Sequence, residues 1–464
     1  MPVITRHFID VGTRRVHYRK CGYGPALLMV HQSPRSSKEY ESLMRDWGAH
    51  FTCIAPDTPG FGQSEPLPGS PAIDDFADAN IALLDALGLG QVAAYGFHSG
   101  GIILVTALKR HPERFSRLAV GGYAIWTPEE MAIFGESYLP PFVPSAYGEH
   151  LTWLWNRILE QSWVFPWFDV RDAARLLNPH DDPAKAHAVV MEMLDAGDAY
   201  RAGYGAVLRA PRDIPPVDAA TPPVLITAYD GDPLQAHIDR LGPMPKGWSA
   251  AKVATPAAHQ AASLAFLMES AEEAVGALPE AGDAGFVHVT TAEFDGLIHW
   301  QGDAVDPPGH GLSDDFQPSS PRREGDAKHR ERNEPPGRSS PGSAGAAPPS
   351  PQSGEGWDRW QAVFDAFEAA TGRKVVLPPL AKGDPDLLYP DLSPDRFGAY
   401  LAKAWSISRA ATLFEPWYEV CAATALPIDP ARITPEALAL DTRNRLRAPA
   451  AKALHLARLE RGEG

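Results

Sequence analysis

The stretch that decides the fold reads Gly96-Phe97-His98-Ser99-Gly100-Gly101. It follows a short apolar run, as a sharp turn between a buried strand and a helix would. Such a strained turn needs small residues two positions before and two positions after its tip. Gly96 and Gly100 flank His98 at this spacing, which predicts that His98 lies at the tip. A tip at Ser99 would place Phe97 at one of the small positions, which is sterically poor.

Apolar runs and helical segments alternate on both sides of this turn. The expected strands are 7–18 (a pair turning at Gly12-Thr13), 26–30, 51–55, 91–95, 223–229 and 252–254, and a helix is expected over 73–89. Runs that are apolar throughout suit strands buried on both faces of a parallel sheet. The sequence therefore predicts an α/β fold with a mostly parallel sheet and helices on both faces.

Residues 127 to about 212 interrupt this alternation. Aromatic residues become dense, the strand pattern disappears, and helices are expected over 147–161 and 183–208. An insertion of this kind over a parallel sheet predicts a helical cap that walls a pocket. We expect residues 1–285 to form one domain that includes this cap.

The C-terminal part repeats pieces of the first part. Tyr147-Gly148, Leu151, Trp155 and Pro166-Trp167-Phe168 recur, at a constant offset, as Phe397-Gly398, Leu401, Trp405 and Pro416-Trp417-Tyr418. The segment 55–64 likewise resembles 304–313. These matches predict a shortened, degenerate second copy that begins at 286–312 and continues, mainly as cap-like helices, over 356–464. Residues 313–355 are rich in Pro, Ser, Gly and Arg, which predicts a disordered linker.

Several motifs, taken together and in order, resemble those of the α/β-hydrolase fold superfamily over residues 7 to about 268. They are His31-Gln32-Ser33-Pro34 after a buried strand, Asp57-Thr58-Pro59-Gly60-Phe61-Gly62-Gln63-Ser64, the turn at 96–101, Asp232-Pro233 after a strand, and His259 after another. The resemblance implies a nucleophile at the turn, an acid at Asp232 and a base at His259 in a loop past the last strand. Asp230 competes with Asp232 for the acid role. The resemblance also implies an oxyanion hole built from the backbone N–H groups of Ser99 and of the loop at Gln32.

Histidine stands where the superfamily pattern has its nucleophile, and this leaves three interpretations open. Ser99 reaches the pocket from a distorted turn, with His259 as base and Asp232 as the carboxylate that orients it. Alternatively His98 is itself the working group, or it only fills space and the site is inactive. Substrate contacts are expected from His31, Trp126 and Trp155, although His31 in such a loop more often braces the backbone.

Composition excludes several classes of partner. The chain has 464 residues and a formal net charge of -16, with 42 basic and 58 acidic residues, which argues against binding nucleic acid or an anionic membrane. The three cysteines are far apart and fit neither disulfides nor a zinc site, so no metal is expected. No dinucleotide or phosphate-binding loop is present, so no cofactor is expected. A start without a signal-like apolar segment predicts a cytoplasmic protein.

These observations predict a hydrolase of a small ester-like or apolar substrate, working through His98 or Ser99 with Asp232 and His259. Two alternatives stay open. One is a cofactor-independent lyase or oxygenase on the same fold, and the other is a catalytically inactive binding or interaction protein. The second copy either packs on the first as a lid or pairs between chains in a homodimer.

Overall fold

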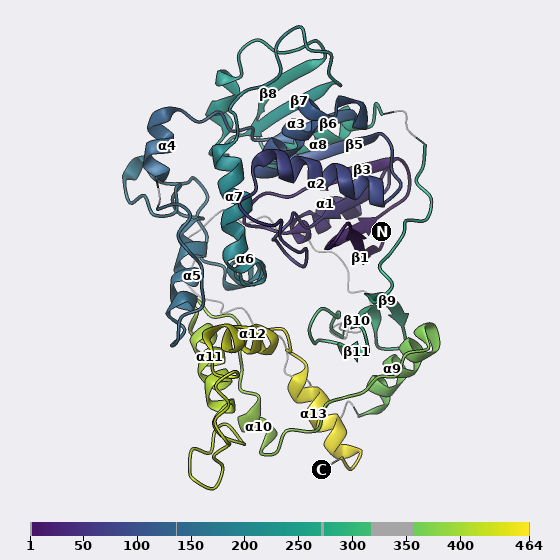
Figure 1. Ribbon diagram of the computed structural model, residues 1–464, viewed down its shortest axis with the longest axis vertical. Helices are drawn as coiled ribbons and strands as arrows, with labels where there is room; N and C mark the ends of the chain where they lie inside the picture. The colour runs from purple at the N-terminus through teal and green to yellow at the C-terminus, as the bar shows by residue number, and fades with distance from the viewer. Residues whose placement is uncertain (1, 136, 271–272, 317–355, 464) are drawn as a thin grey trace, which may run out of the picture. The chain divides into compact units, whose positions relative to one another are not determined.

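The computed structural model describes residues 2–135, 137–270, 273–316 and 356–463 (Figure 1). The chain forms two compact units. Unit 1 is Met1–Phe286 with Asp391–Leu446, and unit 2 is Val287–Pro390 with Arg447–Gly464. This division differs from the expected boundaries, because the segment 391–446 belongs with the first 286 residues. Most of the expected linker, residues 317–355, lies outside the described residues.

Unit 1 is built on an eight-stranded sheet. In spatial order its strands are β1 (Ile4–Val11), β2 (Arg14–Cys21), β4 (Thr52–Pro56), β3 (Ala26–Val30), β5 (Val92–Phe97), β6 (Phe115–Gly121), β7 (Val224–Tyr229) and β8 (Trp248–Val253). The first two strands form an antiparallel hairpin, and β2 pairs antiparallel with β4. All the other neighbours are parallel. β3 and β4 are buried along their whole length, as central parallel strands must be.

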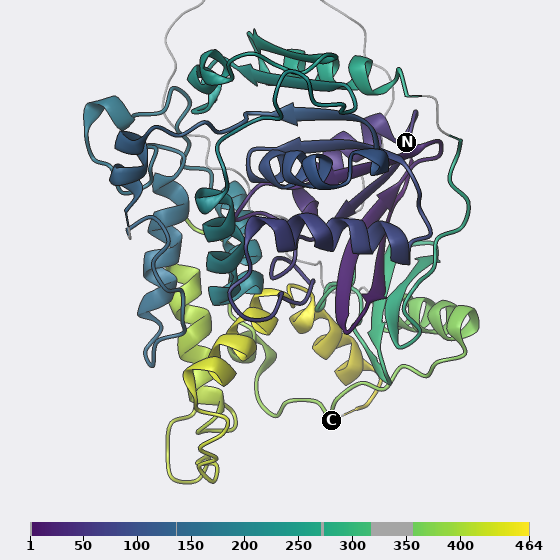
Figure 2. The ribbon, with the colours of Figure 1, turned by 45° about the horizontal axis from the view of Figure 1, so that its top comes forward.

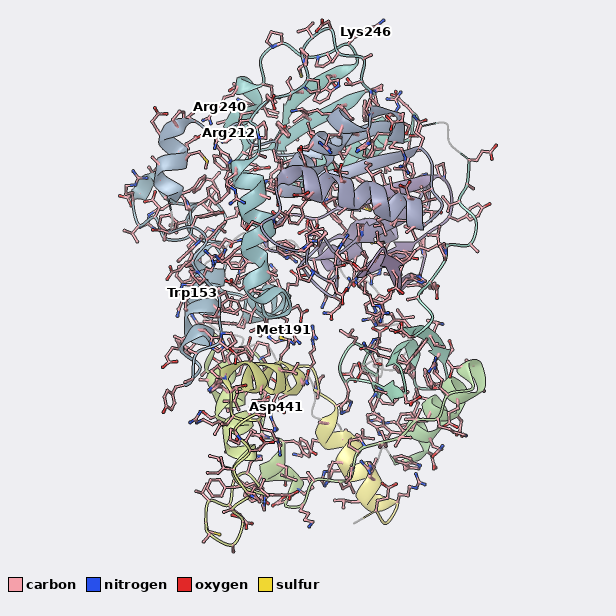
Figure 3. All side chains as sticks on the ribbon, in the orientation of Figure 1. Trp153, Met191, Arg212, Arg240, Lys246 and Asp441 are labelled. Atoms are coloured by element: carbon pink, nitrogen blue, oxygen red, sulfur yellow. The ribbon has the colours of Figure 1, made fainter. Side chains whose placement is uncertain are left out.

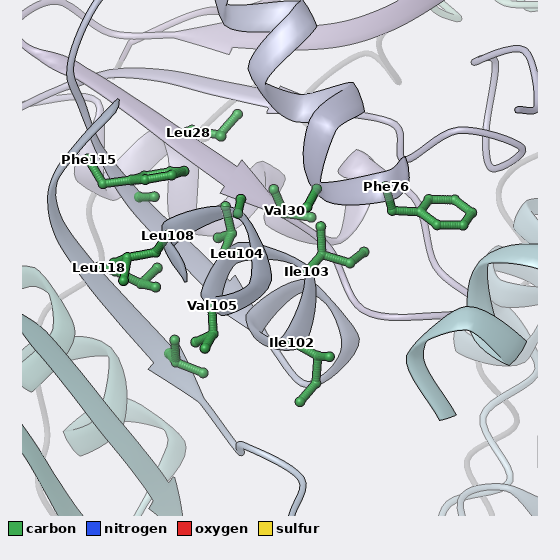
Figure 4. Packing of buried hydrophobic residues seen from close by; sticks show 14 of the residues in the cluster. Leu28, Val30, Phe76, Ile102, Ile103, Leu104, Val105, Leu108, Phe115 and Leu118 are labelled. Atoms are coloured by element: carbon green, nitrogen blue, oxygen red, sulfur yellow. The ribbon is translucent and has the colours of Figure 1, made fainter. Parts of the chain in front are cut away.

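Helices cover both faces of this sheet, so the predicted fold class is confirmed. The helices α2 (Ile73–Ala86) and α3 (Ser99–Arg110) share one buried cluster with the sheet. The helices α1 (Glu41–Trp47) and α8 (Pro256–Leu267) contribute to a second cluster with it. Figure 4 shows how α3 buries Ile103, Leu104 and Leu108 among residues of neighbouring strands. This packing fixes the start of α3, where the turn at His98 lies.

Between β6 and β7 the chain makes a helical excursion, residues 122–223. Its helices are α4 (Pro128–Phe134), α5 (Glu149–Glu160), α6 (Pro183–Ala196) and α7 (Tyr200–Arg209). The prediction of one helix over 183–208 is wrong, because α6 ends at Gly197, which has a φ of 52°. A residue with a positive φ stops a right-handed helix, and glycine adopts such a φ without steric cost.

Two helices from the C-terminal part pack against this excursion within unit 1. They are α11 (Ala399–Ala411) and α12 (Pro435–Leu446), which share a buried cluster with α5 and α6. Figure 3 labels one residue on each of three of these helices: Trp153 on α5, Met191 on α6 and Asp441 on α12.

Unit 2 has a small three-stranded sheet of its own. Its strands are β9 (Ala284–Thr290), which begins in the last residues of unit 1, β10 (Asp295–Gln301) and β11 (Ala304–Val305). Its helices are α9 (Asp358–Thr371), α10 (Pro385–Leu388) and α13 (Ala451–Glu460). β10 and β11 are antiparallel, as are β2 and β4 in unit 1.

One loop geometry occurs in both units. In unit 1, His17 Nδ1 lies 2.9 Å from Asp57 Oδ2, and in unit 2 His299 Nδ1 lies 2.9 Å from Asp306 Oδ2. Each aspartate closes its loop by accepting a backbone N–H, from Gln63 and from Leu312 respectively. The segments 55–64 and 304–313 are therefore alike in structure as well as in sequence.

Unit 1 also contains short 3-10 helices: η1 (Ser37–Tyr40), η2 (Pro112–Arg114), η3 (Asp172–Ala174), η4 (Gly197–Ala199) and η5 (Gln235–Arg240). Among the described residues, no helix combines the length and the apolar character needed to cross a bilayer.

Candidate active site

The turn between β5 and α3 holds His98 in a strained backbone conformation. Its φ is 48° and its ψ is -113°, and it is the one non-glycine residue of the described chain with a positive φ. The two flanking glycines have no room for a side chain. A Cβ on Gly96 would lie 2.7 Å from the backbone of residue 100, and a Cβ on Gly100 would lie 1.8 Å from Val30 O. Such strain persists where surrounding packing enforces it, often at functional sites.

His98 pairs directly with Asp232, which follows β7. His98 Nε2 lies 3.0 Å from Asp232 Oδ1. The His98 side chain is 22% exposed, whereas the Asp232 side chain is fully enclosed. Asp232 Oδ2 is buried and has no hydrogen-bond partner among the described residues. A buried carboxylate oxygen without a donor is unusual, because burying a charged oxygen without a hydrogen bond costs free energy.

The electrostatics favour an ionised Asp232. Burial alone would raise its pKa, but His98 and the backbone N–H of Leu234 together hold the pKa below its ordinary value. Asp230, the alternative acid, is exposed and accepts a hydrogen bond from Gln235 Nε2. The structure thus places Asp232, and not Asp230, against the turn.

Ser99 is the first residue of α3, and its hydroxyl is engaged elsewhere. The residue is 5% exposed, and its Oγ accepts a hydrogen bond from the backbone N–H of Ser33 at 2.6 Å. This bond ties the start of α3 to the loop after β3. The side chain is therefore used to join two backbone segments of the site.

His259 does not lie in a loop, and that expectation is wrong. It belongs to the first turn of α8, because Thr255 caps the helix and Pro256 occupies its first turn. Both ring nitrogens are engaged, Nε2 with Tyr95 Oη at 2.8 Å and Nδ1 with Thr227 Oγ1 at 2.6 Å. Burial lowers the pKa of His259 to about 4, although Asp232 opposes this shift. At neutral pH it is an uncharged, buried side chain.

The Phe97 ring contacts both histidines. It stacks on the His98 ring at a centroid distance of 4.1 Å and lies 5.7 Å from the His259 ring. The structure brings His98 and Asp232 together. The expected pairing of Asp232 with His259 is absent from the hydrogen bonds of the described residues. His259 instead braces β5 and β7 from below the turn.

The loop after β3 supplies further polar groups. His31 is 1% exposed and accepts the backbone N–H of Thr58 at Nε2, so it braces the loop and does not face a substrate. The backbone N–H of Gln32 makes only a long contact of 3.5 Å with Glu39 Oε1. Burial raises the pKa of Glu39 to about 7, with Arg35 opposing and Glu192 reinforcing the shift. Glu39 Oε2 is enclosed and has no partner among the described residues.

The two tryptophans expected to contact substrate have other surroundings. Trp126 packs edge-on against His237 and Phe134, at centroid distances of 4.6 and 4.7 Å. Trp155 is 1% exposed and packs on Gly398 of the C-terminal part, so it cannot contact a substrate. The sequence could not reveal this, because a buried packing surface and a pocket wall have the same aromatic composition.

A cleft opens beside the loop after β3. Its lining is largely polar: Gln32, Ser33, Arg35, Ile158, Gln161, Ser162, His180, Lys185, Ala186 and Val189. Arg35 is held by Glu192 of α6 through a 2.5 Å contact between its Nε and Oε2. The described residues include no group of three or more His, Cys, Asp or Glu side chains arranged to hold a metal.

Sequence reasoning missed Glu39, Tyr95 and Thr227 as members of this site. Tyr95 and Thr227 sit in strands read as apolar, and a polar residue near the carboxyl end of such a strand is the available signal. For His259 the signal was Thr255-Pro256, a typical cap and first-turn pair that starts the helix early.

Comparison with known proteins supports the fold. Residues 25–133 match the family model described as alpha/beta hydrolase fold. Haloalkane dehalogenase 2 of Mycobacterium tuberculosis is 30% identical over 147 residues, which are 32% of this chain and 51% of that protein. (E)-2-((N-methylformamido)methylene)succinate hydrolase of Acinetobacter baylyi is 29% identical over 107 residues, covering 23% of this chain and 41% of that protein.

A solved hydrolase from Pseudomonas aeruginosa is similar at 19% identity and a TM-score of 0.42, covering 56% of this chain and 98% of that one. The chain spans about half the length, or less, of the curated relatives above. The relatives with stated activities include several hydrolases, while the match lies in the part that forms the sheet and the turn at His98. The N-terminal part of this chain has the α/β-hydrolase fold, and its residues 25–133 resemble that superfamily in sequence.

Proposed function

We propose that this protein is a hydrolase of a small ester-like or related substrate, in which His98 activates water and Asp232 holds His98. The observation that carries the proposal is the 3.0 Å contact between His98 Nε2 and the buried Asp232 Oδ1. Ser99 and His259, the other residues expected to react, are both engaged in hydrogen bonds that leave them out of such a pair.

The pairing assigns the two nitrogens of His98 different tasks. An ionised carboxylate only accepts hydrogen bonds, so Nε2 carries a proton and donates a hydrogen bond to Asp232. In the neutral ring Nδ1 then holds the lone pair and is the basic nitrogen. We propose that Nδ1 takes a proton from water while the water oxygen bonds to the acyl carbon. Asp232 stabilises the resulting imidazolium. The bond between the acyl carbon and the leaving group then breaks, and the imidazolium returns its proton to the leaving group.

The start of α3 supports stabilisation of the negative oxygen that forms in this step. The first backbone N–H groups of a helix have no acceptor within the helix, and the helix dipole favours negative charge there. Ser99, Gly100 and Gly101 supply these groups next to His98. The backbone N–H of Gln32 makes only a long contact of 3.5 Å with Glu39 Oε1. We propose that this N–H is a second hydrogen-bond donor to the negative oxygen.

The test is hydrolysis of p-nitrophenyl acetate by the full chain and three variants. We expect His98→Ala and Asp232→Asn to lower kcat by about 100-fold or more, the usual contribution of a positioned general base. The matched control is Ser99→Ala at the neighbouring position, which we expect to stay within about threefold of the parent because its hydroxyl only joins the start of α3 to the loop after β3. A fluorophosphonate probe should leave the protein unlabelled.

The alternatives predict different results. Fluorophosphonate labelling that Ser99→Ala abolishes and His98→Ala preserves would contradict the proposal and favour a serine hydrolase. Turnover of a carbon acid without hydrolysis of any ester, still dependent on His98, would favour a lyase or oxygenase. Ligand binding without turnover in the parent and in all variants would favour an inactive binding protein.

A further inference from the structure

Two helices of unit 1, one from each matched segment, pack against each other. α5 belongs to the segment 147–168 and α11 belongs to its repeat, 397–418. Figure 2 shows the two helices side by side, α5 in blue and α11 in yellow-green. Each helix begins directly after a glycine in the left-handed conformation, Gly148 with a φ of 84° and Gly398 with a φ of 67°.

The contacts between these segments are reciprocal. The Trp405 ring covers Gly148, where a Cβ would lie 2.8 Å from the ring, and the Trp155 ring covers Gly398, where a Cβ would lie 2.4 Å from it. The Trp405 ring also meets His150 edge-on at 5.0 Å, and the Trp155 ring meets Tyr400 edge-on at 5.6 Å. The matched positions are 148 and 398, 150 and 400, and 155 and 405. Exchanging them converts each contact of one tryptophan into the corresponding contact of the other.

We call Gly148, His150 and Trp155 the Trp155 face, and Gly398, Tyr400 and Trp405 the Trp405 face. When residue i of one copy contacts j of the other and j contacts i, the interface has twofold character, as between identical subunits. Both tryptophans are buried, Trp155 to 1% and Trp405 to 2% exposure. A surface that receives its own repeat in this manner is complementary to itself.

The interface also carries contacts that are not reciprocal. Trp155 Nε1 donates to Arg396 O at 3.2 Å, whereas Trp405 Nε1 is buried without a partner among the described residues. Tyr400 Oη and His187 Nδ1 lie 2.7 Å apart, and His187 lies outside the matched segment 147–168. The two faces have therefore diverged toward pairing with each other, while the shared tryptophan and glycine contacts are kept.

We propose that the Trp155 face is a docking surface for a second copy of itself, and that residues 391–446 fill it from within the same chain. The partner that fits the face is thus another α5 segment of this chain, with its Trp155 on Gly148 and its His150 beside that tryptophan. The second copy takes the place of a second subunit, and the intact chain has no free Trp155 face for pairing.

The test is the mass of the full chain in solution, by light scattering after size exclusion. The release variant is Gly398→Leu/Trp405→Glu. It places a leucine side chain against the Trp155 ring and a charge where the Trp405 ring contacts Gly148. Both changes lie outside the Trp155 face. We expect the parent to have the mass of one chain and the release variant to reach twice that mass, reversibly with concentration. Circular dichroism checks that the release variant is folded.

The matched control adds Gly148→Leu to the release variant, which blocks the exposed face itself and should restore the mass of one chain. Trp405→Ala is the milder second variant, for use if the double change unfolds the protein, and it should show the same dimerisation at higher concentration. The proposal is overturned if the folded release variant, or Trp405→Ala in its place, has the same mass as the parent and the control. The Trp155 face would then not pair.

Discussion

At the scale of single residues, the site combines backbone strain with a buried charge. A non-glycine residue at positive φ costs about 1–3 kcal/mol. His98 has this conformation, and the backbone packs so closely around it that a side chain at Gly96 or Gly100 would clash. The His98 ring lies 3.0 Å from Asp232, measured from Nε2 to Oδ1. Glycine spacing around residue 98 therefore predicted which residue occupies the tip, whereas nothing in that spacing predicts which nitrogen meets which carboxylate.

Glu39 gives the protein a pH dependence that can be measured. Its carboxyl has a pKa of about 7 in the folded protein, raised from 4.5 by burial. Below about pH 4.5 the group is protonated in both the folded and unfolded states and costs nothing. Between pH 4.5 and about pH 7, Glu39 is ionised in the unfolded chain and still protonated in the folded protein. The free energy of unfolding therefore falls as pH rises, by roughly 3 kcal/mol in total.

We expect Glu39→Gln to remove this loss, because an amide stays neutral at every pH. The variant should match the parent near pH 4.5 and exceed its free energy of unfolding by roughly 3 kcal/mol near pH 8. Urea unfolding at both pH values measures the difference. Glu129→Gln, at an exposed position of α4, is the control and should be nearly neutral at both. A parent whose stability rises over this window, or a Glu39→Gln variant with no gain, contradicts the argument.

At the scale of elements, the start of α3 depends on its close approach to β3. A Cβ on Gly100 would lie 1.8 Å from Val30 O, a backbone atom that cannot move without shifting the strand. We expect Gly100→Ala to lower the free energy of unfolding by roughly 3 kcal/mol, the upper range for an overpacked site. Ester turnover should fall with it, since the turn that carries His98 is displaced.

Gly90→Ala is the matched control for this change. Position 90 has open space around its Cβ, so the same added methyl meets no atom there. Chemical unfolding and p-nitrophenyl acetate turnover of the two variants give the comparison. If Gly100→Ala behaves as Gly90→Ala does, the tight contact between α3 and β3 is not needed for either stability or turnover.

The elements also show why some boundaries were predictable and others were not. Ala26 to Val30 is apolar at every position and forms β3 over the same residues. Helical periodicity over 183–208 continues through Gly197, so it does not reveal the break, which depends on the positive φ of that residue. The reciprocal seating of Trp155 and Trp405 is a contact between segments far apart in the chain, and periodicity carries no information about such contacts.

At the scale of the whole molecule, the C-terminal part contributes to both units in turn. The chain leaves unit 1 at residue 286, returns to it for 391–446 and ends in unit 2. Sequence matching identified which segments are repeated, and it could not show that one of them would join the first unit. That outcome follows from the complementarity of the Trp155 and Trp405 faces, because buried tryptophan rings contribute large apolar areas to an interface.

Unit 2 has a separate buried cluster, and this predicts that it can lose stability by itself. Phe367 on α9 is fully buried with Val289, Phe294, Ile298 and Val363, all of them residues of unit 2. Phe367→Ala leaves a cavity that costs about 3–5 kcal/mol. We expect faster amide hydrogen exchange in α9 and β10, with exchange in β3 and β5 and turnover at His98 unchanged.

The matched variant is Leu154→Ala, which removes a fully buried side chain from the cluster of α5 in unit 1. It should speed exchange in α5 and α11 and leave α9 as protected as in the parent, because the two buried clusters consist of different residues. Hydrogen-exchange mass spectrometry of both variants resolves these segments. Loss of protection throughout the chain in either variant would mean that the two units unfold as one, and that the second copy stabilises the site through more than the Trp155 face.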